Sequence, residues 1–101
     1  MNNKIKNEAT DKLFRYILEM KTVDECYKLF EDLCTVHELQ AIAQRMAVAE
    51  MLNDKRTYIE IAEKTGASTA TISRVNRALN YGTDGYKLAI ERHRETESKS
   101  L

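Results

Sequence analysis

The chain has no proline and only three glycines, Gly66, Gly82 and Gly85. Because these two residue types are the ones that most often interrupt helices, long stretches of the chain can be helical without a break. No apolar run approaches the ~20 residues that span a bilayer, and the first residues lack the apolar core of a secretory signal. We therefore expect a helical protein without a membrane span that stays in the cytoplasm.

Cysteine and histidine are also scarce. The chain has two of each, Cys26, Cys34, His37 and His93, and they form no close pairs. Zinc sites are built from such pairs, so we expect no metal and no other cofactor. In a reducing cytoplasm both cysteines would remain thiols and would pack as small apolar side chains in helices.

Charge is balanced overall, with 16 basic and 16 acidic side chains in 101 residues. It is unevenly distributed, because residues 1–54 carry 7 basic and 10 acidic side chains whereas residues 55–101 carry 9 and 6. The length is typical of one domain covering residues 1–101. The basic excess lies in the half that contains the unusually polar stretch KTGASTATISRV.

A capping-box pattern, Thr-x-x-Glu, occurs at Thr22, Thr35 and Thr57, each time before an apolar-periodic segment. In this motif the Thr hydroxyl accepts from the N3 amide and the Glu carboxylate accepts from the N-cap amide, which marks a helix start. With the apolar periodicity, the pattern predicts an all-α fold of six helices. We expect them at about 5–20, 23–33, 36–52, 58–64, 68–79 and 86–95, with a turn over 80–85 and a flexible tail over about 96–101.

The stretch TYIEIAE permits a second interpretation, since Ile59 and Ile61 alternate with polar residues as in a β-strand. The capping box at Thr57 and the helix stop offered by Gly66 favour a helix. No second stretch offers a matching strand, and a lone strand would leave its backbone groups unpaired.

Residues 58–79 are typical of a helix-turn-helix. Ala62 is small enough for a second helix to cross close to it, and Gly66 can adopt the positive φ that a tight turn needs. Ile72, Val75 and Leu79 follow at the spacing of a single stripe, which would dock the second helix on the domain.

The remaining face of this second helix is slim, polar and basic. Such a face suits the DNA major groove, where hydroxyls and arginines bind phosphates or bases and methyl groups contact thymine. The amino end of the helix would also favour phosphate. The candidate DNA-binding residues are Ser68, Thr69, Ala70, Thr71, Ser73, Arg74 and Arg77.

Three other interpretations compete with DNA binding. The segment could be a plain helical hairpin with a solvated face, or an interaction module whose helix-turn-helix contacts protein. An enzyme is the third, but the two histidines are isolated, and neither a nucleophile–base pair nor a phosphate-binding loop is recognisable. We therefore expect no catalytic residues.

The segments LCTVHELQAIAQRMAVAEML and EKTGASTATISRVNRAL resemble the tryptophan repressor superfamily, in particular its bacterial YerC/YecD-like branch. The resemblance covers about Leu29 to Leu79. It implies an intertwined all-α homodimer whose two recognition helices enter successive major grooves of a palindromic operator, and so a DNA-binding transcriptional regulator such as a repressor.

The resemblance also implies an effector pocket. In the family, tryptophan lies between two arginines, which correspond here to Arg45 and Arg74, and a threonine is kept at Thr35. Three positions depart from the family pattern: Asp32 replaces an apolar residue, Val75 a glycine and Ala78 a serine. A branched side chain fills the space of the indole, and the lost hydroxyl leaves the ligand ammonium unpaired, so we do not expect tryptophan to act as effector.

A homodimer is also favoured by the apolar pattern of residues 5–20. Leu13 and Ile17 form one stripe, and Phe14 and Leu18 flank it. A helix that is apolar around much of its girth has two packing partners. In a chain this short, the second partner is expected to be another copy.

Overall fold

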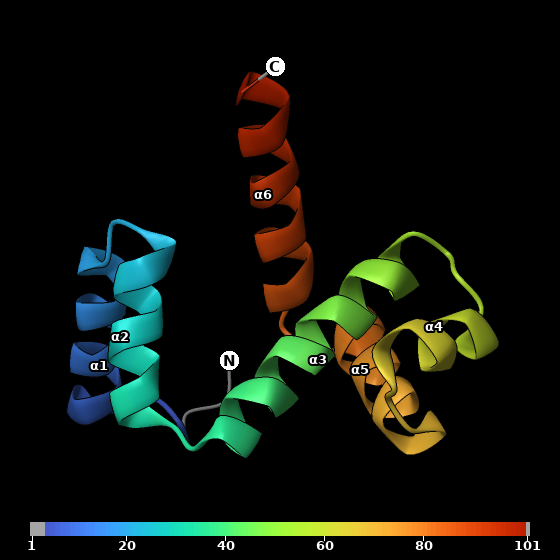
Figure 1. The fold of residues 1–101 in the computed structure, drawn as a ribbon, viewed down its shortest axis with the longest axis horizontal. Coiled ribbons are helices and arrows are strands. Elements are labelled where there is room, and N and C mark those ends of the chain that lie inside the picture. The colour runs from blue at the N-terminus through green and yellow to red at the C-terminus, as the bar shows by residue number, and fades with distance from the viewer. Residues whose placement is uncertain (1–3, 101) are drawn as a thin grey trace. The chain divides into compact units, whose positions relative to one another are not determined.

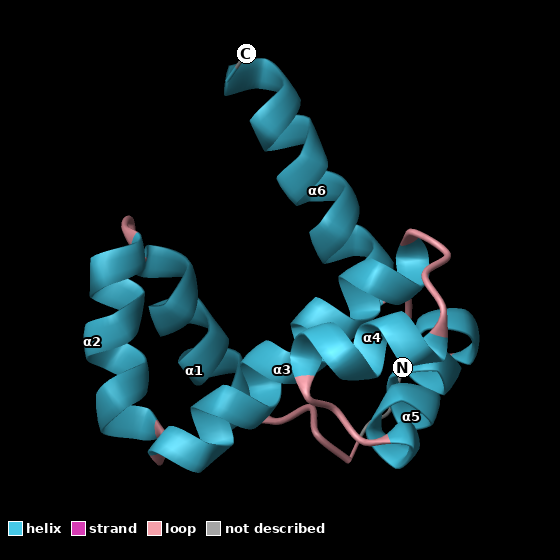
Figure 2. Cartoon of the chain, turned by 45° about the vertical axis from the view of Figure 1, so that its right-hand side comes forward, coloured by secondary structure: helices cyan, strands magenta, loops and turns pink. Residues whose placement is uncertain are grey.

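The computed structural model describes residues 4–100 and is all-α, as predicted (Figure 1). Its helices are α1 (Glu8–Glu19), α2 (Val23–Leu33), α3 (Val36–Asn53), α4 (Tyr58–Thr65), α5 (Thr69–Tyr81) and α6 (Gly85–Ser100). Figure 2 shows only helices and loops in this part of the chain, so the strand interpretation of TYIEIAE is wrong. Contacts divide the chain into two units, Met1–Leu39 and Gln40–Leu101, which are described separately. The single domain over residues 1–101 stays a prediction.

Helices α2, α3 and α4 begin at the predicted residues, but α1 begins later than predicted. Its first residue is Glu8 rather than Ile5, because Asn7 has an extended backbone and caps the helix. The side-chain oxygen of Asn7 accepts a hydrogen bond from the amide of Thr10 at 2.9 Å. An Asn oxygen in this position satisfies an amide that has no partner inside the helix, which fixes the start of α1.

The last two helices are longer than predicted. Helix α5 continues past Leu79 to Tyr81, and the predicted turn over 80–85 shortens to 82–84. Helix α6 continues to Ser100, where we predicted fraying after Glu95; Leu101 lies outside the described residues. No glycine or proline follows Gly85, so nothing in the sequence stops α6.

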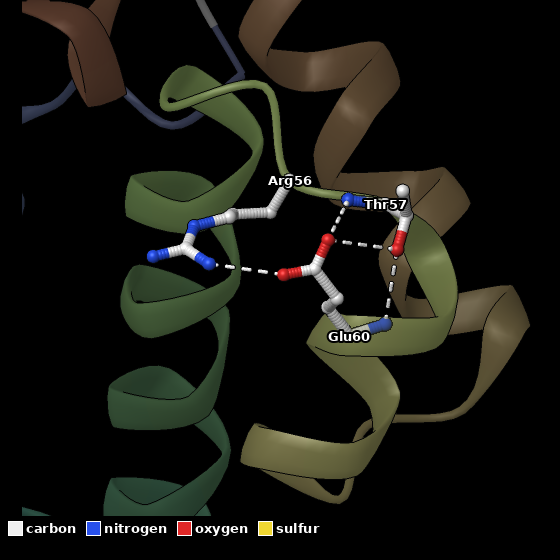
Figure 3. A network of polar contacts seen from close by, with 3 residues as sticks. All are labelled: Arg56, Thr57 and Glu60. Carbon is white, nitrogen blue, oxygen red and sulfur yellow. Dashed lines mark hydrogen bonds and ion pairs between the residues drawn. The ribbon is translucent and has the colours of Figure 1, made fainter.

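Two of the three predicted capping boxes form completely. At Thr35 and Glu38 the two reciprocal bonds measure 2.8 and 3.1 Å, and Thr57 and Glu60 make the same pair (Figure 3). At the start of α2 the carboxylate of Glu25 instead accepts from the amide of Lys21. The predicted box is therefore incomplete there, although Thr22 still caps the helix.

The capping carboxylates titrate below their usual range. Hydrogen bonds from the backbone and hydroxyl of Thr35 lower the pKa of Glu38. The side chain of Arg56, followed by the backbone and hydroxyl of Thr57, lowers the pKa of Glu60. Because the folded-state pKa is lowered, each carboxylate supports its helix start above the unfolded pKa and loses this contribution as the pH falls through the folded pKa.

The first unit contains no buried side chain in the residues that the structure describes. Helices α1 and α2 lie side by side (Figure 1), and neither has a buried residue. Large apolar side chains remain in solvent, including Phe14 at 54% exposure, Leu18 at 81% and Val23 at 72%. Helices of 12 and 11 residues are marginal alone in water and need packing partners to be stable. The described part of this unit has no buried core that could supply that packing.

All of the buried apolar side chains of the described chain lie in the second unit. They form one cluster that joins the end of α3 to α4, α5 and α6, namely Val48, Ala49, Leu52, Ile61, Ala67, Ile72, Val75, Leu79 and Ile90. The small residues Ala49 and Ala67 allow close approach of the helices around the bulky ones. This core fixes the position of α5 on the domain.

Helix α6 is joined to the rest of the second unit by side chains between Tyr86 and Arg94. Ile90 is buried and Tyr86 packs against the core, and Arg94 forms an ion pair with Asp54. Beyond Arg94 every side chain up to Lys99 is exposed, and Figure 1 shows this end of α6 leaving α3, α4 and α5. No described helix combines the length and the apolar character that crossing a bilayer requires.

Candidate nucleic-acid interface

Helices α4 and α5 form the predicted helix-turn-helix. Helix α4 ends at Thr65 and is capped by Gly66, whose φ of 73° and ψ of 6° place it in the left-handed region. The amide of Gly66 donates to the carbonyl of Ala62 at 2.9 Å. The prediction that Gly66 supplies a positive φ is confirmed. A glycine adopts this conformation without the backbone strain that it gives other residues, so the chain can turn directly into α5.

Two residues that the sequence analysis did not single out hold this turn. The hydroxyl of Thr65 donates to the carbonyl of Ile61 at 2.7 Å and accepts from the amide of Ala67 at 3.1 Å. The side-chain amide of Gln44, on α3, donates to the carbonyl of Thr65 at 3.1 Å. Gln44 lies 21 residues before Thr65 and no local pattern in the sequence marks it, so the contact could not be predicted.

Replacing Gly66 tests the turn. We expect Gly66→Val to lower the melting temperature and to weaken DNA binding, since a β-branched residue at positive φ costs about 1–3 kcal/mol. A Cβ at this position would meet no atom within 4 Å, so the cost is backbone strain rather than crowding. Gly66→Asn is the matched control, because asparagine tolerates this region. If thermal unfolding gave the same melting temperature for Gly66→Val as for the wild type, the turn would not depend on the left-handed conformation.

The predicted docking stripe of α5 is confirmed. Ile72, Val75 and Leu79 are buried, with 0%, 1% and 4% of their surface exposed. They meet Ile61 of α4 and Val48 of α3 in the core. Burying a side chain of this size contributes roughly 1.5–3 kcal/mol, so the stripe fixes which face of α5 points outward.

The outward face carries the candidate DNA-binding residues. The exposed ones are Ser68, Thr69, Ala70, Ser73, Arg74 and Arg77, whereas Thr71 is half-buried. Ala70, Ser73 and Arg77 are three or four residues apart, which puts them on one side of the helix. Apart from the two arginines, the candidate residues are small, and the bulky exposed side chain of Tyr81 lies at the carboxyl end of α5. The amino half of this side is therefore narrow enough for a groove ~12 Å wide.

Ser68 is the N-cap of α5, which limits what it can offer a ligand. Its hydroxyl oxygen accepts from the amide of Thr71 at 3.1 Å and the hydroxyl donates to Oγ1 of Thr71 at 3.1 Å. Both hydroxyls are thus engaged in the cap. In this arrangement Ser68 and Thr71 position the amino end of α5. The hydroxyls of Thr69 and Ser73 are exposed and have no hydrogen-bond partner within residues 4–100.

The charge on this face is uncompensated. Neither Arg74 nor Arg77 is paired with a carboxylate in the part of the chain that the structure describes. The sequence has no acidic residue between Lys64 and Asp84. Unpaired guanidinium groups on a narrow helix face can bind phosphate oxygens or the edge of guanine.

The residues of the effector pocket implied by the family lie in both units. Arg45 is half-buried and Arg74 exposed, both in the second unit. Thr35 belongs to the first unit, where its hydroxyl accepts from the amide of Glu38. Val75, where the family has a glycine, belongs to the core, and Ala78 is exposed. Among residues 4–100 no cluster of His, Cys, Asp and Glu could hold a metal ion.

The family model described as Trp repressor protein matches residues 8–94. The chain belongs to this family. The match takes in both units and the entire helix-turn-helix, and the Trp repressor family is one of non-enzymatic regulators.

This member of the Trp repressor family is also similar to individual proteins over most of their length. It is 52% identical to the uncharacterised protein YerC of Bacillus subtilis (strain 168), over 97% of this chain and 94% of YerC. A TrpR-like protein from Eubacterium eligens ATCC 27750 has a crystal structure that matches 90% of this chain and 94% of its own, at 59% identity and a TM-score of 0.87. A candidate Trp repressor from Staphylococcus aureus matches 93% and 95%, at 45% identity and a TM-score of 0.89. The TrpR-like fold predicted from the sequence is confirmed.

Proposed function

We propose that the protein is a sequence-specific DNA-binding transcriptional regulator that acts in the cytoplasm as a homodimer on a palindromic operator. The observation that carries the proposal is the outward face of α5. A buried stripe holds the helix in place, and its opposite side presents Thr69, Ser73, Arg74 and Arg77, with no acidic residue between Lys64 and Asp84. Family membership supports this function.

The exposed apolar side chains of the first unit support the homodimer. Helices α1 and α2 have no buried residue and leave large apolar side chains in solvent. A second copy of the chain would cover them, as in the intertwined homodimer that the family resemblance implies. DNA recognition favours the same assembly, because two recognition helices related by a dyad read half-sites about 34 Å apart.

The alternative is a helix-turn-helix that contacts protein and does not bind DNA specifically. A salt titration separates the two. Contacts from Arg74, Arg77 and other cations to phosphates should make DNA affinity fall steeply and linearly in log–log form as salt rises. Fluorescence anisotropy on operator-length duplexes would measure this slope; flat, weak binding at every salt concentration would favour the protein-contact alternative.

We propose that tryptophan is not an effector of this protein. We expect calorimetry with millimolar tryptophan to show no appreciable binding and the presence of tryptophan to leave DNA affinity unchanged. The reason is that Val75, with 1% of its surface exposed, occupies core space where the family has a glycine, and Ala78 offers no hydroxyl. Binding at micromolar concentration would contradict this and would require the pocket to rearrange around Val75.

A further inference from the structure

A second candidate site lies on the flank of α5 opposite to the family's effector position. A groove of about 490 Å³ opens between the end of α3, the carboxyl half of α5 and the first turn of α6. Asn76 and Asn80 border it on α5. They follow Arg74 and Ala78 by two residues, which places them ~200° around the helix from these positions. The groove is therefore distinct from the pocket that the family resemblance implies.

The walls of this groove are basic. Lys55, Arg56 and Lys87 line it and no carboxylate does. Arg56 shares its charge with Glu60 through an ion pair of 2.9 Å. The two lysines make no ion pair within the described chain. The groove thus offers two free ammonium groups and one partly compensated guanidinium to a ligand.

Amide groups and an apolar floor complete the lining. The side-chain amide of Asn80 donates to the backbone carbonyl and the side-chain oxygen of Asn76, both at 2.9 Å. This leaves the NH₂ group of Asn76 available as a donor beside the lysines. The core residues Leu52 and Leu79 also border the groove. A site with an apolar floor and a few polar groups is typical of small-molecule binding, and its volume lies in the usual range.

The backbone of Lys55 gives an independent indication of function. Its φ is 64°, a left-handed conformation that is uncommon for lysine. The turn after α3 is a Schellman motif, since the amide of Arg56 donates to the carbonyl of Met51 and the amide of Lys55 to that of Leu52, both at 3.0 Å. Glycine is the usual residue at this position. Lysine at this position therefore carries a conformational cost, and its side chain lines the groove.

We propose that this groove binds a small molecule that carries an oxyanion, either phosphate or carboxylate, on a partly apolar body. Lys55 and Lys87 would bind the oxyanion, with the NH₂ group of Asn76 as a neutral donor. The apolar part would lie on Leu52 and Leu79. The groove is at the carboxyl half of α5, whereas helix-turn-helix proteins read bases with the amino half, so a free ligand fits it better than DNA does.

The test measures binding of pyrophosphate and of citrate to the full-length protein by calorimetry, with sodium chloride at matched ionic strength as the reference. We expect saturable binding of one of these probes and none of chloride. A stronger response to pyrophosphate assigns the oxyanion as phosphate, and a stronger response to citrate assigns it as carboxylate. No saturable binding of either probe at 10 mM, roughly the range expected for small anions on two lysines, would overturn the proposal.

Two variants separate binding from stability. Lys87→Gln should weaken binding of the probe roughly tenfold, as expected for the loss of one charge-assisted hydrogen bond. Lys55→Gly should weaken it similarly and yet raise the melting temperature, because glycine removes the cost of the left-handed conformation. Lys99→Gln is the control, since Lys99 is exposed on α6 and does not line the groove.

Unchanged affinity in both groove variants would overturn the proposal. A second result would also overturn it: the wild type binds neither probe, and Lys55→Gly and Lys87→Gln lower the affinity for DNA and its dependence on salt. That result would assign the lysines to a DNA phosphate and would leave the proposed regulator function standing.

Discussion

Replacing both outward arginines, Arg74→Ala with Arg77→Ala, should abolish specific DNA binding while the protein stays folded. Each contact to a base edge is worth roughly 1–3 kcal/mol, so the loss of two corresponds to about 30-fold or more in affinity. Both side chains are exposed and neither has a carboxylate partner in the described chain, so their removal leaves no group unsatisfied in the fold. Fluorescence anisotropy at moderate salt measures the change.

Two further variants sharpen this prediction. Arg92→Ala removes an exposed arginine of α6 that lies outside the helix-turn-helix, and it should leave specific binding close to that of the wild type. Changes at Thr69 or Ser73 should alter which sequence is preferred more than how tightly DNA binds in general, because they remove base contacts rather than charge. Wild-type affinity in the double arginine variant would show that α5 is not the recognition helix.

The second large effect concerns the first unit. Ile17→Asp or Leu13→Asp should abolish folding and dimerisation together, since these half-buried residues form the inner stripe of α1. Leu18→Asp is the more diagnostic change. Leu18 is 81% exposed in the isolated chain, and a charge there would change the stability of a monomer by no more than about 0.5 kcal/mol. In a dimer that covers this side chain, the same charge would be buried without a partner and would prevent assembly.

Light scattering and circular dichroism distinguish these outcomes. We expect the wild type and the control Lys12→Gln, an exposed position on α1, to be dimers at micromolar concentration. Leu18→Asp should be unfolded or unable to dimerise. A folded wild-type monomer that binds its operator tightly, or a Leu18→Asp variant indistinguishable from the wild type, would rule out the proposed dimer.

Local signals in the sequence determined most of the fold. The starts of α2, α3 and α4 could be predicted because Thr22, Thr35 and Thr57 cap them, and a cap acts on amides only three residues away. The predicted start of α1 was wrong because the apolar stripe continues to Ile5, which precedes the capping residue Asn7 and lies outside the helix. The predicted end of α6 was wrong because a polar composition alone does not end a helix.

The outward face of α5 could likewise be predicted, because the i, i+3, i+7 spacing of Ile72, Val75 and Leu79 fixes the buried side and leaves the rest to solvent. The hydrogen bond from Gln44 that supports the turn could not be predicted. Gln44 lies 21 residues from Thr65 in the sequence, and nothing local connects a polar residue on α3 to that carbonyl. The left-handed backbone of Lys55 was equally hidden, since lysine rarely adopts it.

The most direct test of the proposed regulator is a genome-wide map of DNA sites bound by the native protein, made in parallel with the Arg74→Ala, Arg77→Ala double variant. We expect the native protein to occupy discrete sites that share a palindromic motif, with half-site centres about 34 Å apart on the duplex. The double variant should lose these sites. Occupancy by the native protein that shows no shared motif and does not exceed that of the variant would contradict sequence-specific DNA binding through α5.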